Sequence, residues 1–332
     1  MLVAVLLFIV GLVLLIKGGD WFVDGATGIA RKFNMPEILV GATIVSIGTT
    51  LPEVMVSATS AVGGHGEIAY GNAIGSIICN TALIAALTIA IKPSKVNKST
   101  LKIPVAFFFV SAAFYSIIAY TQGEFSRTTG VILLAIFVIY MIVNVTAAIK
   151  LPNAKNEEEL KPSDAGADIE AETKTNSTIK DIILLVVGAV LIAVGADLLV
   201  DNGTLIAKGL GVPESVIALT IVALGTSLPE LVTAITSLMK GSGALSLGNI
   251  IGANIFNLVL VSGVSTVLSP FSIPQEKLIG GMNASLVLDI PVMLAVMLLL
   301  TIPPLISGKL KRPVGILLLG IYVAFCIIQF AV

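Results

Sequence analysis

Charged side chains are scarce in this sequence of 332 residues, since Asp, Glu, Lys and Arg together make up only 12%. A typical soluble domain carries about 25%. The chain also has one histidine, two cysteines and 6% aromatic residues. No basic patch, aromatic platform or zinc-ligand spacing is present, which excludes nucleic acid as a partner. One histidine and two cysteines are also too few for a metal centre built from histidine or thiol ligands.

The two cysteines, Cys79 and Cys326, both lie in apolar runs, so no disulfide is expected. The first apolar run starts at Met1 without a basic segment before it, so we expect no cleavable signal peptide. The single histidine, His65, falls between apolar runs. No paired-aspartate or Ser–His arrangement stands out in the apolar runs, so we do not expect an enzyme.

Apolar residues make up 56% of the chain, and its mean hydropathy is +1.05. They form runs that approach or exceed the ~20 residues with which a helix crosses a bilayer, whereas barrel strands are about half as long. The sequence therefore predicts an all-α, multi-pass membrane protein with ten transmembrane helices. The predicted spans are 2–25, 37–63, 69–91, 102–121, 128–150, 180–203, 214–240, 246–268, 282–305 and 313–331.

One long polar segment, residues 151–178, contains seven of the twenty acidic residues and is predicted to be a flexible linker. It divides the chain into two five-helix halves, 1–150 and 179–332. With both termini outside, the inside loops carry fifteen lysines and arginines and the outside loops carry three. The positive-inside rule then places the protein in the cell membrane with both termini outside and the linker in the cytoplasm.

The two halves share an internal repeat. GATIVSIGTTLPEV at 41–54 matches ALTIVALGTSLPEL at 218–231 in eight of fourteen positions, at an offset of 177 residues. At the same offset, GNAIGSIICN at 71–80 matches GNIIGANIFN at 248–257 in six of ten positions. Because five spans is an odd number, the second half must enter the membrane in the opposite orientation. Such inverted repeats are typical of secondary transporters, which bind their substrates near the midplane.

Glu53 and Glu230 occupy matching positions inside apolar spans, where an ionisable group indicates function. Pro52 and Pro229 lack the amide proton that would bond the carbonyls of Gly48 and Gly225, so these carbonyls are free to face a ligand. The motifs add further oxygen donors close by. These are Thr49, Thr50, Thr226 and Ser227 around the prolines, and Ser76, Asn80 and Asn257 in the third and eighth spans.

This donor set consists of carboxylate, hydroxyl, amide and carbonyl oxygens, which suit Ca²⁺, Mg²⁺ or Na⁺. Two glutamates supply a charge of −2, which one divalent cation, several Na⁺ or two protons can balance. A charged site that cannot stay empty in a region of low dielectric constant favours obligatory exchange over leak.

These motifs resemble those of the calcium/cation antiporter superfamily, and specifically of the sodium/calcium exchangers. The resemblance covers nearly the whole chain and is carried by GTTLPE, GTSLPE and the two GNxxG segments. It implies that Glu53 and Glu230 form a central calcium site with oxygens of Thr49 and Thr226. It also implies flanking sodium sites, formed by Thr50, Ser227, the carbonyls of Ser46 and Ala223, and Ser76. Asn80 matches a polar residue that lines the centre.

Two positions depart from the family pattern. Ala253 stands where the second repeat usually has a serine like Ser76, which removes one oxygen from a flanking sodium site. Asn257 stands where potassium-dependent relatives have an aspartate, so the resemblance is to the potassium-independent branch. The linker lacks the large calcium-binding regulatory domains of animal exchangers.

We therefore expect a Na⁺/Ca²⁺ antiporter that works by alternating access, with Ca²⁺ and Na⁺ as transported ions and no cofactor. A proton-coupled exchanger on the same scaffold is one alternative, and a cation channel with a glutamate-lined pore is another. The lipid bilayer is its environment, and no obligatory protein partner is indicated.

Overall fold

The computed structural model describes residues 2–33, 35–150, 178–210, 225–275 and 277–331. Within these ranges nine helices are long and apolar enough to cross a membrane, and a shorter apolar helix covers Leu228–Met239. Helices satisfy the backbone hydrogen bonds that lipid cannot. The predicted all-helical membrane fold is therefore confirmed. The start of the predicted span 214–240 and the linker up to residue 177 lie outside the described residues.

The first half begins with α1 (Leu2–Lys32). Its second span is α2 (Glu37–Val40), the π-helical turn η1 (Gly41–Val45) and α3 (Ser46–Val62), and its third is α4 (Gly66–Cys79), η2 (Asn80–Ala85) and α5 (Ala86–Ile91). Strand β1 (Ser94–Lys95), helix α6 (Lys98–Thr121), strand β2 (Glu124–Phe125) and helix α7 (Arg127–Lys150) complete it. The first half therefore contains five spans.

The second half begins with α8 (Thr178–Gly209), so the helix starts at the last residue of the predicted linker. It continues with α11 (Leu228–Met239), then α12 (Gly243–Phe256), η4 (Asn257–Val261) and α13 (Ser262–Leu268) as one span. After β3 (Phe271–Ser272), β4 (Leu278–Ile279) and β5 (Met282–Asn283), a span is formed by η5 (Ser285–Asp289) and α14 (Ile290–Ser307). Strand β6 (Lys309–Leu310) and helix α15 (Arg312–Ala331) end the chain.

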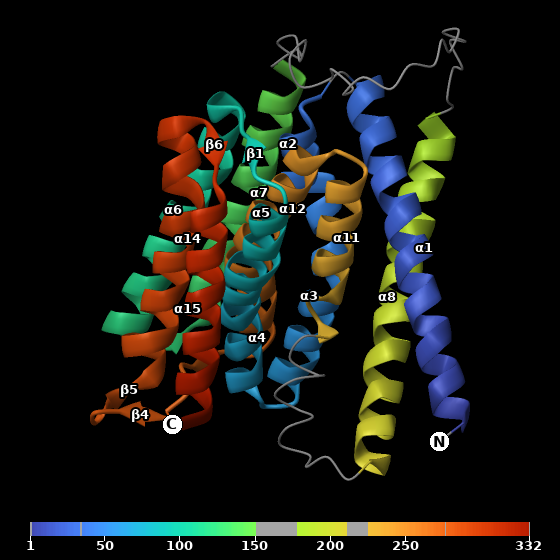
Figure 1. Ribbon diagram of the computed structural model, residues 1–332. Helices are drawn as coiled ribbons and strands as arrows, with labels where there is room; N and C mark the ends of the chain where they lie inside the picture. The colour runs from blue at the N-terminus through green and yellow to red at the C-terminus, as the bar shows by residue number, and fades with distance from the viewer. Residues whose placement is uncertain (1, 34, 151–177, 211–224, 276, 332) are drawn as a thin grey trace, which may run out of the picture.

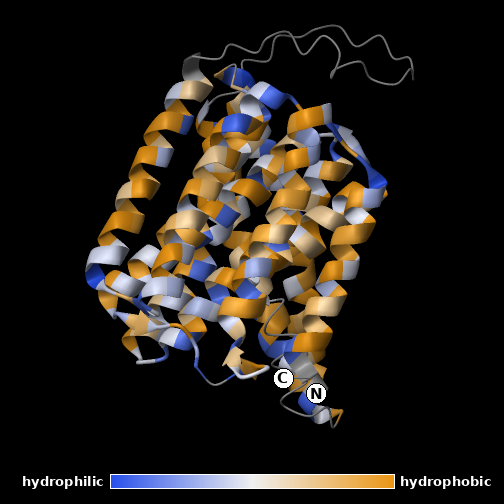
Figure 2. Cartoon of the chain, turned by 90° about the vertical axis from the view of Figure 1, so that its left-hand side faces the viewer, coloured by the Kyte–Doolittle hydropathy of each residue, from blue (hydrophilic) through white to orange (hydrophobic). Residues whose placement is uncertain are grey.

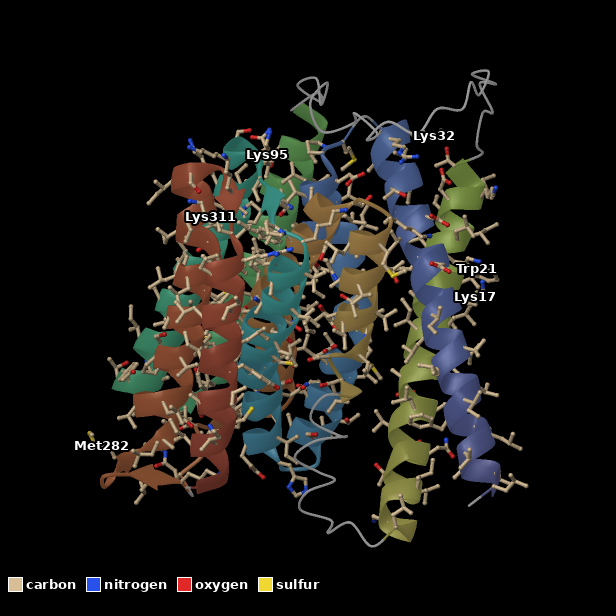
Figure 3. All side chains as sticks on the ribbon, in the orientation of Figure 1. Lys17, Trp21, Lys32, Lys95, Met282 and Lys311 are labelled. Atoms are coloured by element: carbon tan, nitrogen blue, oxygen red, sulfur yellow. The ribbon has the colours of Figure 1, made fainter. Side chains whose placement is uncertain are left out.

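The helices form a bundle in which α3, α4, α11 and α12 lie in the middle, α14 and α15 on one side, and α1 with α8 on the other (Figure 1). Hydrophilic residues gather at the two ends of the bundle, and apolar residues cover much of its length (Figure 2). The N-terminal end of α1 and the C-terminal end of α15 lie at the same end (Figure 1). Lys32, Lys95 and Lys311 lie at the opposite end (Figure 3).

Short strand pairs join the two halves. β1 of the first half pairs antiparallel with β6 of the second, and β2 of the first half pairs antiparallel with β3 of the second. The pair β1–β6 joins the connection after the third span to the connection after the ninth span. The pair β2–β3 joins the connection after the fourth span to the connection after the eighth span. The two pairs are therefore equivalent under exchange of the halves, as inverted repeats require.

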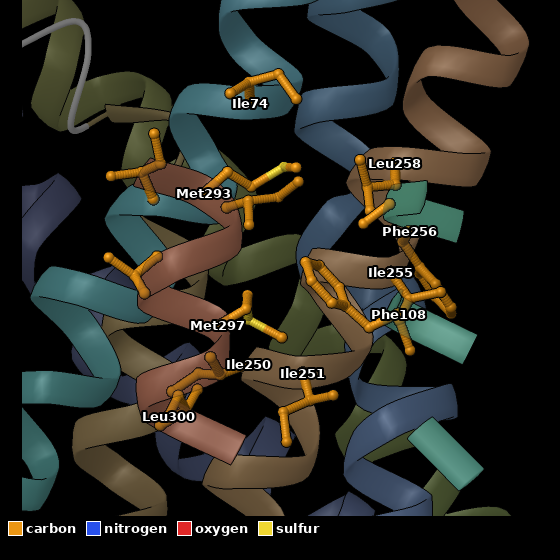
Figure 4. Close-up of a cluster of buried hydrophobic side chains, with 14 of the residues drawn as sticks. Ile74, Phe108, Ile250, Ile251, Ile255, Phe256, Leu258, Met293, Met297 and Leu300 are labelled. Carbon is orange, nitrogen blue, oxygen red and sulfur yellow. The ribbon is translucent and has the colours of Figure 1, made fainter. Parts of the chain in front are cut away.

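The central helices pack through a large buried apolar cluster. In it, α12 contributes Ile250, Ile251, Ile255 and Phe256, and α14 contributes Met293, Met297 and Leu300 (Figure 4). By contrast, α1, α8 and α15 expose many large apolar side chains. This distribution places α12 in the protein interior and the other three helices against lipid.

Helices α1 and α8 form a tight pair through glycines. A Cβ on Gly11 would lie 2.8 Å from the carbonyl oxygen of Gly195, and a Cβ on Gly195 would lie 2.8 Å from that of Gly11. Gly18 and Gly188 make the same approach, at 2.9 and 2.8 Å. Since Gly11 and Gly188 are repeat equivalents, as are Gly18 and Gly195, the pair is symmetric. No side chain other than hydrogen allows backbones to approach so closely.

Candidate functional site

The two motif glutamates lie in the middle of the bundle, Glu53 on α3 and Glu230 in the first turn of α11. Both are fully buried, and the two carboxylates interact electrostatically. None of their four side-chain oxygens accepts a hydrogen bond within the described part of the chain. Buried carboxylates that accept no hydrogen bond need a cation to balance their charge.

The two helices carry the motif differently. In α3 the helix runs through Pro52 without ending, and it follows directly on the π-helical turn η1. In the second repeat Pro229 lies in the first turn of α11, where a proline removes no helical hydrogen bond. Pro52 therefore lies inside a helix, whereas Pro229 lies at the start of one. The segment before Gly225 lies outside the described residues.

Hydroxyl groups of the motifs surround the carboxylates. The Glu230 carboxylate faces the hydroxyls of Thr49 and Thr50, which belong to the first repeat. The hydroxyls of Thr50 and Ser227 are buried and have no hydrogen-bond partner among the described residues. Thr226, in the turn before α11, donates a hydrogen bond to Asn72 (3.4 Å). The two repeats therefore contribute to one common site.

The amides of Asn80 and Asn257 are also fully buried, and neither side chain has a hydrogen-bond partner within the described ranges. Asn80 is the first residue of the π-helical turn η2, and Asn257 is the first residue of η4. The turn η2 packs on α11, and η4 packs on α3. Each amide therefore starts a turn that contacts the glutamate helix of the other repeat, and such π-helical turns are frequent at functional sites.

Ser46 and Ser76 lie beside this centre, and both hydroxyls are engaged. Ser46 Oγ donates toward the carbonyl oxygens of Gly41 (2.8 Å) and Asn249 (3.0 Å). Ser76 Oγ donates to Asn72 Oδ1 at 3.5 Å. Ala223, the repeat equivalent of Ser46, lies outside the described residues.

Three residues at the site were missed from the sequence. Asn72 and Asn249, the asparagines of the two GN pairs, accept hydrogen bonds from motif hydroxyls. The GN repetition was the signal that could have found them. Cys79 lies beside Ser227 and Glu230, and nothing in its sequence context indicates this.

The GNxxG glycines have different surroundings in the two repeats. A Cβ on Gly252 would clash with Ala42, with its Cα at 2.6 Å and its carbonyl oxygen at 2.8 Å, and Gly248 is approached by the backbone of Ile38. These two glycines therefore allow a close helix contact in the second repeat. No atom of the described residues lies within 4 Å of such a Cβ on Gly71 or Gly75.

The site is asymmetric because three serines of the first repeat are alanines in the second. The equivalent pairs are Ser46 and Ala223, Ser57 and Ala234, and Ser76 and Ala253. The two repeats therefore place hydroxyl oxygens at different positions, and the two flanks of the glutamate pair differ.

Oxygen is the predominant donor at this site. Within the described residues no three His, Cys, Asp or Glu side chains gather to hold a metal ion. A pair of carboxylates with hydroxyls and amides is instead a ligand set for hard cations such as Ca²⁺ and Na⁺.

A narrow cavity separates the site from the α1–α8 pair. It is lined by Thr49, Pro52 and Pro229 from the motifs and by Phe22 of α1, among others. The α1–α8 pair therefore covers the motif prolines and reaches the threonine beside the glutamates.

Four acidic residues outside the site, Asp20, Asp24, Asp289 and Glu67, have partners. Lys240, which follows α11, lies 2.8 Å from Asp24 and 3.6 Å from Asp20 of α1. Asp289 accepts a hydrogen bond from Gln329 at 2.6 Å. His65 lies at the surface, 3.5 Å from Glu67. Both cysteines are free.

Comparison with known proteins adds independent findings. The family described as sodium/calcium exchanger protein matches residues 3–146 and 180–331. The putative antiporter CaxA of Alkalimonas amylolytica is 36% identical, over 94% of this chain and 93% of that protein. The sodium/calcium exchanger MaX1 of Methanosarcina acetivorans is 31% identical over 98% of each chain. A structure of the sodium-calcium exchanger NCX_Mj, soaked with Na⁺ and Sr²⁺, superposes with a TM-score of 0.80 at 32% identity, over 97% of each chain.

Proposed function

The chain belongs to the sodium/calcium exchanger family, and we propose that it exchanges Na⁺ for Ca²⁺, without K⁺, at the site between α3 and α11. As a member of this family it is a multi-pass membrane antiporter of cations and not an enzyme. The proposal concerns the coupling ion, the residues of the site and the orientation in the membrane.

One observation carries this assignment. Two fully buried glutamates, contributed by equivalent positions of the two repeats, interact electrostatically and accept no hydrogen bond from the described residues. An uncompensated buried charge is costly, so the pair needs a cation or protons. Its charge of −2 is neutralised by one Ca²⁺ or by Na⁺ ions that spread over the flanking hydroxyls.

Glu53, Glu230, Thr49 and Thr226 are assigned to the central Ca²⁺ site. The flanking Na⁺ sites are assigned to Thr50, Ser227, Ser76 and the carbonyl oxygens of Ser46 and Ala223. Asn80 and Asn257 line the centre with neutral amides, which add no third charge that would call for K⁺. This assignment is supported by the unpartnered oxygens of Thr50, Ser227 and the two amides.

Obligatory exchange follows from the same electrostatics. If the loaded site is close to neutral and the empty site carries buried negative charge, the barrier to reorientation is lower with ions bound. Na⁺ bound from one side and Ca²⁺ bound from the other then replace each other in turn. The Na⁺ gradient drives Ca²⁺ transport by this competition.

Alternating access is assigned to sliding of the α1–α8 pair along the central helices. The glycine contacts hold these two helices together, and their lipid-facing sides carry apolar residues that can shift in the bilayer. Their inner faces meet the motif prolines and Thr49 across a narrow cavity. A shift of the pair therefore changes which side of the membrane reaches the site.

The proposed orientation has both termini outside and residues 151–178 in the cytoplasm, with 1–150 and 179–332 as the two repeats. The ends of α1 and α15 share one face of the bundle (Figure 1). Lys32, Lys95 and Lys311 lie at the other face, which is then cytoplasmic (Figure 3). Reaction of single introduced cysteines with an impermeant reagent tests this orientation.

Uptake of radioactive Ca²⁺ into proteoliposomes tests the coupling ion. Vesicles loaded with Na⁺ and diluted into Na⁺-free, K⁺-free buffer are expected to take up Ca²⁺, and dissipation of the Na⁺ gradient is expected to stop it. Uptake driven by a proton gradient without Na⁺ would replace Na⁺ by H⁺ as the coupling ion. Ca²⁺ flux that needs no counter-ion would indicate a channel.

A further inference from the structure

Two asparagines make the same hydrogen bond in the two repeats, across the boundary between them. Thr49 Oγ1 of the first repeat donates to Asn249 Oδ1 of the second at 3.2 Å. Thr226 Oγ1 of the second repeat donates to Asn72 Oδ1 of the first at 3.4 Å. Since Asn72 and Asn249 are repeat equivalents, as are Thr49 and Thr226, the two bonds are related by the internal symmetry.

This bond is unusual for a threonine of a helix. Helical threonine hydroxyls commonly donate to a carbonyl three or four residues earlier, as Thr27 does to Val23 (2.8 Å) and Thr43 to Leu39 (2.7 Å). Thr49 in α3, and Thr226 in the turn before α11, direct their protons to the other repeat. A hydroxyl coordinates a cation through its oxygen lone pairs, which requires that its proton point away from the ion.

The orientation of the Asn72 amide follows from its partners. Its Nδ2 donates to the backbone carbonyl of Glu53 at 3.2 Å and to Ser57 Oγ at 2.8 Å. A carbonyl can only accept, so the nitrogen must be on this side and the oxygen must face Thr226. Asn72 therefore ties the backbone of one motif glutamate to the threonine of the other motif.

Asn249 is held in a different way. Ala234 stands where the first repeat has Ser57, and the Asn249 Nδ2 has no partner in the described part of the chain. Its Oδ1 lies 3.2 Å from Ser46 Oγ, whose single proton can also be donated to the carbonyl oxygens of Gly41 or Asn249. Asn249 therefore accepts the hydrogen bond from Thr49, although Ala234 offers no hydroxyl to its amide nitrogen.

We propose that Asn72 and Asn249 are positioning residues of the cation site. Each accepts the hydroxyl proton of the threonine from the opposite repeat and thereby turns the threonine oxygen toward the ion. Hydrogen bonds that orient ligands in this way are commonly as important as the ligands themselves. The inference rests on the proposed cation site and makes each half of that site dependent on the other repeat.

Double-mutant cycles test this cross-repeat coupling. The readout is the half-saturating Ca²⁺ concentration in equilibrium binding to purified protein. Asn72→Ala is expected to raise it about fivefold, as for one lost hydrogen bond. Because Asn72 acts in part through Thr226, adding Asn72→Ala to Thr226→Val is expected to raise it by clearly less than fivefold; the bonds of Asn72 to Glu53, Ser57 and Ser76 account for the remainder. Adding Asn72→Ala to Thr49→Val is expected to raise it by the full fivefold.

Asn249 gives the mirror-image expectation, with a clearly reduced effect on Thr49→Val and a full effect on Thr226→Val. The matched control is Asn202→Ala on α8, where a buried asparagine donates to the carbonyl of Leu198 in its own helix; its half-saturating concentration is expected to equal that of the wild type. If a threonine-to-valine variant does not fold, the serine variant replaces it. A serine keeps the hydroxyl and is expected to keep full sensitivity to loss of its asparagine.

Full additivity in the Asn72–Thr226 and Asn249–Thr49 pairs would overturn the inference, as would equal coupling in all four pairs. A merely structural asparagine would lower the amount of folded protein and leave the half-saturating concentration of the folded fraction unchanged. The proposed function fails separately, if wild-type protein binds Ca²⁺ but shows no Na⁺-dependent uptake. The cycles remain readable in that case because they measure binding.

Discussion

Replacing Glu230 with glutamine removes one of two buried carboxylates while it nearly preserves the shape of the side chain. In the wild-type protein without cations, the two carboxylates are buried and accept no hydrogen bond from the described residues. Loss of one relieves their mutual repulsion. We therefore expect the cation-free variant to be at least as stable toward unfolding as the cation-free wild type.

The response to Ca²⁺ is expected to change in the opposite direction. Removing one partner of a buried ionic interaction costs about 3 to 5 kcal/mol, which corresponds to a loss of about 10² to 10⁴ in Ca²⁺ affinity. At a Ca²⁺ concentration of 100 times the wild-type Kd, binding stabilises the wild type by about 2.7 kcal/mol. With affinity lowered by about 10², the same concentration stabilises the variant by only about 0.4 kcal/mol.

Thermal unfolding of purified protein, with and without Ca²⁺, measures both effects. Glu53→Gln is expected to behave like Glu230→Gln, because the two positions are equivalent. Glu67→Gln provides the matched control, since Glu67 is an exposed glutamate outside the site. A Ca²⁺-induced increase in Tm as large in Glu230→Gln as in the wild type would refute the assignment. So would a cation-free variant destabilised by more than about 2 kcal/mol, as expected for a glutamate with a structural role.

Three further predictions concern the flanking site and the α1–α8 pair. Ala253→Ser restores an oxygen in the second repeat and is expected to lower the half-saturating Na⁺ concentration a few-fold in Ca²⁺ efflux; no change or an increase would contradict the proposed flanking site. Gly188→Leu would force a side chain into the backbone of Phe22, whose Cα lies 2.7 Å from the added Cβ, and is expected to abolish transport with Ca²⁺ binding retained in equilibrium assays. Lys240→Met removes the exposed ion pair with Asp24, which is worth at most about 1 kcal/mol, so exchange rates should change less than about fivefold.

The number of spans and the internal symmetry could be predicted from the sequence because both depend on long-range patterns that are simple to detect. Apolar runs define the helices, and an odd number of spans between repeats at a fixed offset requires an inverted second half. Glu53 and Glu230 could also be found from the sequence, but for a different reason. A carboxylate inside an apolar run is a strong local signal that does not depend on knowing which helices touch.

The π-helical turns could not be predicted. Two of them, η2 and η4, begin at Asn80 and Asn257, and a third, η1, ends just before Ser46. Each turn changes which side chains face the centre. Their formation depends on packing against the opposite repeat and has no compositional signal. The difference between Pro52 and Pro229 was missed for a related reason, since identical motifs predicted identical helices.

Asn72 and Asn249 show a further limit. Their repetition was visible in the sequence, but asparagines near small residues are also typical of interhelical packing. Only the contacts reveal that each accepts a bond from the threonine of the other motif. Repeats in a sequence identify equivalent residues, whereas the pairing of residues across the repeats is a property of the folded chain.

The central claim is that Ca²⁺ and Na⁺ compete for one site that contains both Glu53 and Glu230. Equilibrium binding of radioactive Ca²⁺ to purified protein, at increasing Na⁺ and constant ionic strength, tests this claim most directly. We expect one bound Ca²⁺ per chain, complete displacement by Na⁺, and loss of this binding in both Glu53→Gln and Glu230→Gln. Ca²⁺ binding that survives saturating Na⁺, or that persists with wild-type affinity in either variant, would contradict the account.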